Sequence, residues 1–169
     1  MLSKLLALTL VGATAVFSIS SISASAAPTG AVEPTESRAY LHNYNIPSSG
    51  LALEGYCPVA YFAVNRPVRG KRELASTHNG VTYYLASKDA KKAFDASPEK
   101  YLPAFGGWCA FGMAVSDKFP VDPTKFKIVD GRLFVFLANK NVDALELWNQ
   151  GNEKELLEKA DAYWNKLNS

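Results

Sequence analysis

The sequence predicts a small α+β domain in which helices pack against a small antiparallel sheet. One hairpin is indicated by two apolar-rich segments, residues 126–130 and 132–137, which meet at Asp130-Gly131. Asp-Gly is a pair favoured by the type I′ turns that join antiparallel strands. Two helices are indicated at the end of the chain, over residues 141–149 and 152–167, because their apolar residues recur at helical spacing.

The middle of the chain adds shorter elements to this domain. Residues 59–64 and 81–86 are rich in aromatic and β-branched side chains, which predicts a strand in each. Ser87 is expected to begin a helix over residues 88–94, since its hydroxyl can accept hydrogen bonds from the first backbone N–H groups. Residues 105–112 fit neither element, and their two leading glycines indicate a positive φ or close packing. No internal repeat is predicted.

The N-terminal segment has the pattern of a secretory signal peptide. Lys4 precedes a short apolar run, and Ala24-Ser25-Ala26 provides a cleavage site of the A-x-A type. The run is too short and too rich in small polar residues for a membrane-spanning helix, which needs about 20 strongly apolar residues. The predicted organisation is a signal peptide over residues 1–26, a flexible leader over residues 27–38 and one domain over residues 39–169.

Charge and export together limit the partners of the mature chain. The whole sequence has a formal net charge of +2, and loss of Lys4 with the signal peptide would leave +1. Such a small charge argues against electrostatic binding of nucleic acid or of an anionic membrane. We therefore expect a periplasmic or secreted protein with no membrane span after signal cleavage, whose partner is a metal ion or an unknown protein.

Several separated blocks of the sequence resemble one known family. They are GYCPVAYF (residues 55–62), HNGVTYYLAS (78–87), PEKY (98–101), GGWCA (106–110), DP (122–123) and ADAYW (160–164). In this order they resemble the YHS domain, and the similarity covers about residues 51–167. The chain looks like a stand-alone exported member of that family.

The resemblance implies a YHS/TRASH-like fold and a link to metals. YHS domains occur beside copper-transporting ATPases and are related to the cysteine-rich TRASH metal-binding domains. The metal-binding relatives have two cysteines around the start of the helix after the second strand, and the matching positions here look like Ser87 and Ala90. His78 matches the histidine for which the family is named, and a structural role in its turn is an equal alternative to a ligand role.

Cys57 and Cys109 are the only cysteines of the chain, and their residue type leaves three alternatives open: a disulfide, a metal site or buried free thiols. An even pair in a small exported domain predicts a Cys57–Cys109 disulfide, which would stabilise the fold by about 4 kcal/mol through the loop that it closes. The same thiols, joined by His78 or Met113, would suit a soft metal such as copper in its Cu(I) state.

The expected function follows from these alternatives. The leading expectation is a non-enzymatic module that binds or handles a soft metal such as copper, because no nucleophile motif, phosphate loop or adjacent dithiol is present. The alternative is a structural, protein-interaction or small apolar ligand-binding module stabilised by the disulfide. Strand alternation puts Tyr83 and Tyr84 on opposite faces, so one of the two can line such a surface.

Overall fold

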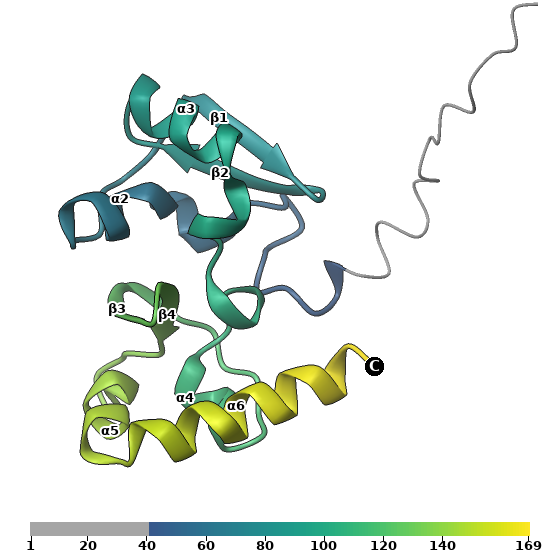
Figure 1. Cartoon of the computed structure of the whole chain (residues 1–169), viewed down its shortest axis with the longest axis vertical. Helices are drawn as coiled ribbons and strands as arrows, with labels where there is room; N and C mark the ends of the chain where they lie inside the picture. The colour runs from purple at the N-terminus through teal and green to yellow at the C-terminus, as the bar shows by residue number, and fades with distance from the viewer. Residues whose placement is uncertain (1–40) are drawn as a thin grey trace, which may run out of the picture. The chain divides into compact units, whose positions relative to one another are not determined.

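The protein is described here by a computed structural model, which covers residues 41–169. The described residues belong to one compact unit and form five α-helices, three short 3-10 helices and two sheets (Figure 1). The small α+β class predicted from the sequence is confirmed. The prediction of a single small sheet is wrong, because the strands form two separate two-stranded antiparallel sheets. The predicted signal peptide and leader lie outside the described residues.

The described residues repeat one motif: a 3-10 helix, an α-helix, a hairpin and a second α-helix. The first motif consists of η1 (Ala52–Gly55), α2 (Pro58–Val64), β1 (Lys71–His78), β2 (Val81–Leu85) and α3 (Lys88–Ala96). The second motif consists of η3 (Ala104–Gly107), α4 (Ala110–Ala114), β3 (Asp122–Val129), β4 (Arg132–Phe136) and α5 (Ala144–Gln150). A short helix, η2 (Pro98–Tyr101), joins the motifs, and α6 (Glu153–Leu167) follows the second. The expectation of no internal repeat is therefore wrong.

The two hairpins correspond pair by pair. Lys71 pairs with Leu85 in the first sheet, and Asp122 pairs with Phe136 in the second, 51 residues further along in both strands. The other paired residues keep the same offset, and a register shift follows this pair in both hairpins. Each hairpin turns through two residues of positive φ, Asn79-Gly80 and Asp130-Gly131, as type I′ turns require.

Within η1 and η3, the chain makes a left-handed turn before the first α-helix of each motif. Residues 53–55 have φ values of 51°, 49° and 83°, and residues 105–107 have φ values of 57°, 58° and 85°. Such backbone costs an L-residue about 1–2 kcal/mol. Both turns are closed by a hydrogen bond, from the N–H of Tyr56 to the Leu53 carbonyl (2.9 Å) and from the N–H of Trp108 to the Phe105 carbonyl (3.1 Å). The positive φ expected at the two glycines before Trp108 is confirmed.

Helix α2 corrects the strand predicted at residues 59–64. Pro58 is well suited to the first helical position, where its missing N–H is not needed and its fixed φ is already helical. The helix buries Val59, Ala60 and Tyr61 and ends at Asn65, which has a left-handed φ of 47°. Packing of this face decides the conformation, because strand propensity depends strongly on tertiary context.

The helices predicted over residues 88–94, 141–149 and 152–167 are present as α3, α5 and α6, although α5 begins three residues later than predicted. Ser87 is the N-cap of α3, and its hydroxyl accepts a hydrogen bond from the Ala90 N–H at 3.0 Å. Asp143 caps α5 by accepting from the N–H groups of Leu145 and Glu146. Helix α6 matches the predicted range of residues 152–167 and packs against α4 (Figure 1).

Strand β4 is shared by two hydrophobic clusters. Leu133 and Val135 belong to the first cluster, with Tyr61, Tyr83, Leu85, Phe94 and Cys57. Phe134 and Phe136 belong to the second cluster, with Phe105, Cys109, Met113, Trp148 and Ala160. Alternate side chains of a strand face opposite sides, and those of residues 133–136 are at most 1% exposed. Strand β4 is thus buried on both faces.

The role of β4 predicts a large cost for shortening one of its core side chains. Leu133→Ala should lower the free energy of unfolding by about 3 kcal/mol, because it leaves a cavity in the first cluster. Urea unfolding followed by circular dichroism measures this. Leu147→Ala is the matched control, since Leu147 is 41% exposed and should lose less than about 1 kcal/mol. Similar losses for the two variants would contradict the assignment of β4 to the core.

Candidate functional site

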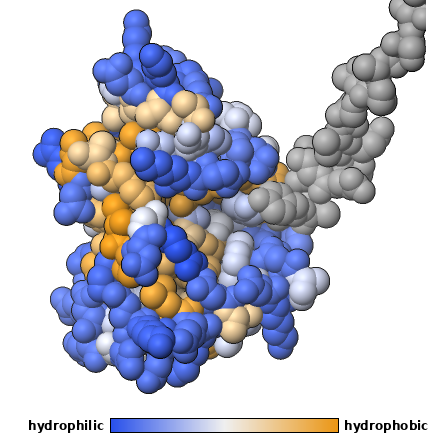
Figure 2. Space-filling model, in the orientation of Figure 1, coloured by the Kyte–Doolittle hydropathy of each residue, from blue (hydrophilic) through white to orange (hydrophobic). Residues whose placement is uncertain are grey.

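A cavity of about 250 Å³ lies beside Cys57, between α2 and the start of α3. Its walls are mostly small apolar side chains, and Arg66 is the charged residue among them. The lining residues are Cys57, Val59, Ala60, Ala63, Val64, Arg66, Val68, Ala86, Ser87 and Ala90. Figure 2 shows apolar residues at the surface where α2 lies in Figure 1. We call this cavity the Cys57 cavity.

The left-handed turn and α2 fix the position of Cys57 in this wall. Cys57 is the N-cap of α2, its backbone N–H donates to the Val68 carbonyl at 2.8 Å, and its carbonyl accepts from Ala60 at 3.2 Å. Cys57 has no exposed surface, so other side chains separate it from solvent and a ligand would reach it only from within the cavity. The resemblance singled out Ser87 and Ala90, and the structure brings both to the same cavity. Cys57 is the sulfur-bearing residue of its lining.

The corresponding place in the second motif is occupied by the Phe119 side chain. The Cys109 N–H donates to the Phe119 carbonyl at 3.1 Å, so Phe119 takes the place of Val68. Gly112 takes the place of Ala60, and a Cβ atom added to it would lie 2.8 Å from the Phe119 ring. The ring thus packs directly on α4, where the first motif keeps an opening beside α2.

Cys57 and Cys109 are equivalent residues of the two motifs. Each is the N-cap of its motif's first α-helix, each is fully buried, and both thiols are free. Cys57 packs in the first cluster and Cys109 in the second, where its sulfur accepts a hydrogen bond from the Gly112 N–H at 3.4 Å. Repetition of the motif alone accounts for an even number of cysteines. The Cys57–Cys109 disulfide stays a prediction from the sequence alone, and alkylation of the isolated protein distinguishes it from the free thiols of the structure.

His78 has different neighbours from the two cysteines. It ends β1, and its Nε2 atom lies 2.6 Å from a carboxylate oxygen of Glu99 on η2. Within residues 41–169, no group of three histidine, cysteine or acidic side chains is arranged to hold a metal ion. Met113 is buried in the second cluster with Cys109. The structure therefore does not gather Cys57, Cys109 and His78 into one three-ligand group.

Tyr83 and Tyr84 differ in burial, as the alternation of side chains along a strand predicts. Tyr83 is buried in the first cluster, whereas Tyr84 is half-buried beside Gly55 of the left-handed turn. Tyr61 of α2 is fully buried, and its hydroxyl donates to the Pro123 carbonyl at 2.8 Å. Burial raises the pKa of Tyr61 well above its usual value, so it is a neutral hydrogen-bond donor and no base.

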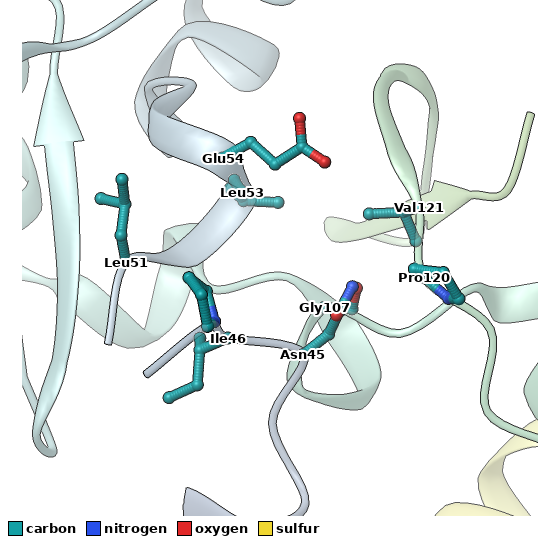
Figure 3. A pocket seen from close by; sticks show the side chains of 9 residues that line it. Asn45, Ile46, Leu51, Leu53, Glu54, Gly107, Pro120 and Val121 are labelled. Carbon is teal, nitrogen blue, oxygen red and sulfur yellow. The ribbon is translucent and has the colours of Figure 1, made fainter. Parts of the chain in front are cut away.

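A second cavity, of about 340 Å³, lies between residues of the two motifs (Figure 3). It is lined by Asn45, Ile46, Pro47, Leu51, Leu53, Glu54, Gly107, Pro120 and Val121. We call it the junction cavity. Glu54 is not among the site residues predicted from the sequence. An alignment of the two motifs could have singled it out, because its counterpart is Gly106.

Comparison with known proteins finds no matching family model, no matching curated protein and no matching solved structure. In the described part of the chain, no helix combines the length and the apolar character needed to cross a membrane. The function is therefore inferred from the sequence pattern and from the geometry of the two cavities.

The burial of both thiols gives a test of their state. The folded protein should not react with a thiol reagent, and both cysteines should become alkylated when urea unfolds it without reductant. Mass spectrometry of protein isolated from its own compartment counts the modified residues. Unfolded protein that gains label only after reduction would instead demonstrate a disulfide.

Proposed function

We propose that this chain is an exported, non-enzymatic binding module of the YHS type that holds a small apolar ligand in the Cys57 cavity. The signal-peptide pattern supports export to the periplasm or beyond, and the sequence blocks around Cys57 and Ser87 support the family. Both blocks contribute residues to the cavity lining, on α2 and at the start of α3.

The difference between the two copies of the motif carries the proposal. The N–H groups of Cys57 and Cys109 donate to the carbonyls of equivalent residues, Val68 and Phe119, so the comparison of the two sites turns on the side chains around them. Val68 and Ala60 leave room in the first motif, whereas Phe119 packs directly on Gly112 in the second. Since protein interiors are normally close-packed, an opening kept in one copy and filled in the other fits a ligand site.

The size of the Cys57 cavity limits the ligand. Its volume of about 250 Å³ is slightly below the usual range of ligand pockets, about 300–1,000 Å³. A ligand of roughly ten heavy atoms that gains about 0.5 kcal/mol per atom would bind with about −5 kcal/mol, a submillimolar dissociation constant. The apolar lining favours a hydrocarbon or aromatic body, and Arg66 and Ser87 offer polar contacts.

A soft metal such as copper is the second candidate, and the Cys57 thiol is the observation that favours it. A thiolate is a preferred ligand of Cu(I). Ser87 and Ala90 share the cavity but bring no sulfur to it, so a second soft donor would have to come from elsewhere. The apolar ligand ranks first because it uses the cavity as it stands.

Filling the Cys57 cavity as the second motif does should abolish binding. In an NMR titration with toluene, the wild type should show saturable shifts at Ala63, Ala86 and Ala90. Val68→Phe combined with Ala60→Gly should weaken binding at least tenfold while keeping the native fold, because this pair reproduces Phe119 packed on Gly112 in the second motif. Val142→Phe, at an exposed valine outside the cavity lining, is the matched control and should bind like the wild type.

Two results would count against the apolar-ligand proposal. Toluene binding that survives Val68→Phe combined with Ala60→Gly would show that the cavity is not the site. Stoichiometric Cu(I) binding, measured against a competing chelator and lost in Cys57→Ala, would favour the metal candidate if toluene does not bind.

A further inference from the structure

We infer that the junction cavity is a second binding site, and that it takes a small organic cation, an alkylammonium with an apolar body, whose charge is met by the Glu54 carboxylate. This site is separate from the Cys57 cavity, since the two share no lining residue. The inference does not depend on the function proposed above.

The walls of the junction cavity suit an apolar body. Leu53 of the first motif and the preceding Leu51 form one part of the wall, and Pro120 and Val121 of the second motif form another. In Figure 3, Leu53 and Glu54 lie on one side of the cavity and Pro120 and Val121 lie on the other. A volume of about 340 Å³ falls within the usual range for a small-molecule site.

The polar groups of the lining are acceptors that suit a positive charge. Glu54 is the charged side chain of the lining, and its carboxylate forms no hydrogen bond or ion pair within residues 41–169. Asn45 uses its side-chain nitrogen to donate to the Gly107 carbonyl at 3.0 Å, which leaves its amide oxygen as a further acceptor. None of the described residues that line the cavity is lysine, arginine or histidine, so an anion would find no positive side chain among them to pair with.

The backbone at Glu54 distinguishes it from an ordinary surface carboxylate. Glu54 has left-handed angles, φ 49° and ψ 27°, and the equivalent residue of the second motif, Gly106, has φ 58° and ψ 20°. Glycine adopts this conformation without strain, whereas glutamate does not. The first motif thus has a glutamate with a strained backbone where the second motif has glycine. Strained backbone of this kind is common at binding sites.

Arg69 holds this strained backbone and leaves the carboxylate available. Its Nη1 atom donates to the Glu54 backbone carbonyl at 2.7 Å, and its guanidinium lies 4.0 Å from the centre of the Tyr56 ring. A guanidinium so close could have paired with the carboxylate, but it binds the carbonyl instead. The residue at the equivalent position of the second motif, 51 residues later, is Pro120.

The test uses n-hexylammonium as the probe, with hexan-1-ol and hexanoate as matched neutral and anionic compounds. NMR titration of the wild-type domain should give saturable shifts at Leu53, Gly107 and Val121 with hexylammonium. Hexanol should bind at least fivefold more weakly, and hexanoate should not bind. Glu54→Gln should weaken hexylammonium binding at least fivefold, and Glu158→Gln, at an exposed carboxylate outside the cavity, should leave it unchanged.

A second variant separates loss of binding from loss of folding. Glu54→Gly restores the residue of the second motif, so it should unfold at a higher urea concentration than the wild type and still lose hexylammonium binding. The inference is overturned if Glu54→Gln or Glu54→Gly binds hexylammonium as the wild type does, or if hexanol binds equally well. Shifts confined to the Cys57 cavity would overturn it as well.

Discussion

The left-handed turn before each cysteine is the constraint on which the rest of the structure depends. Three consecutive residues of positive φ direct the chain so that the next cysteine begins an α-helix and its N–H reaches the segment that enters the hairpin. In the second motif, space also demands glycine at the turn, because a Cβ atom at Gly106 would lie 3.0 Å from the Trp164 ring. The strain is offset by burial of the following helix, which brings Cys57 or Cys109 into its cluster.

Because the two motifs share this backbone, their side-chain differences mark the positions with separate roles. Phe119 and Val68 occupy matching places, and only the latter leaves an opening beside its helix. Glu54 and Gly106 also match, and only the former brings a charge to the junction cavity. Strand β4 connects the two hydrophobic clusters, because its successive side chains pack alternately into one cluster and the other. Both proposed sites are thus departures of the first motif from the second.

The sequence predicted the features that depend on neighbouring residues. Asp130-Gly131 encodes its turn and Ser87 encodes its cap without help from the rest of the chain. Helix α2 was missed because burial of Tyr61 against distant residues overrides its strand-like composition. The repeat was missed because the motifs share backbone angles more than residue types, and few identities such as Gly55 with Gly107 reveal it. The cavities were missed because their walls come from segments far apart in the sequence.

The most direct test of this account is an NMR measurement of the backbone angles of residues 53–55 and 105–107. Positive φ brings the amide proton close to the α-proton of the same residue, which strengthens their intraresidue cross-peak. The one-bond Cα–Hα coupling also depends on the backbone angles and gives a second measure. The account predicts left-handed angles in both segments, including the non-glycine residues Leu53, Glu54 and Phe105. Extended or right-handed angles in either segment would contradict the repeat, and with it the comparison from which both sites were inferred.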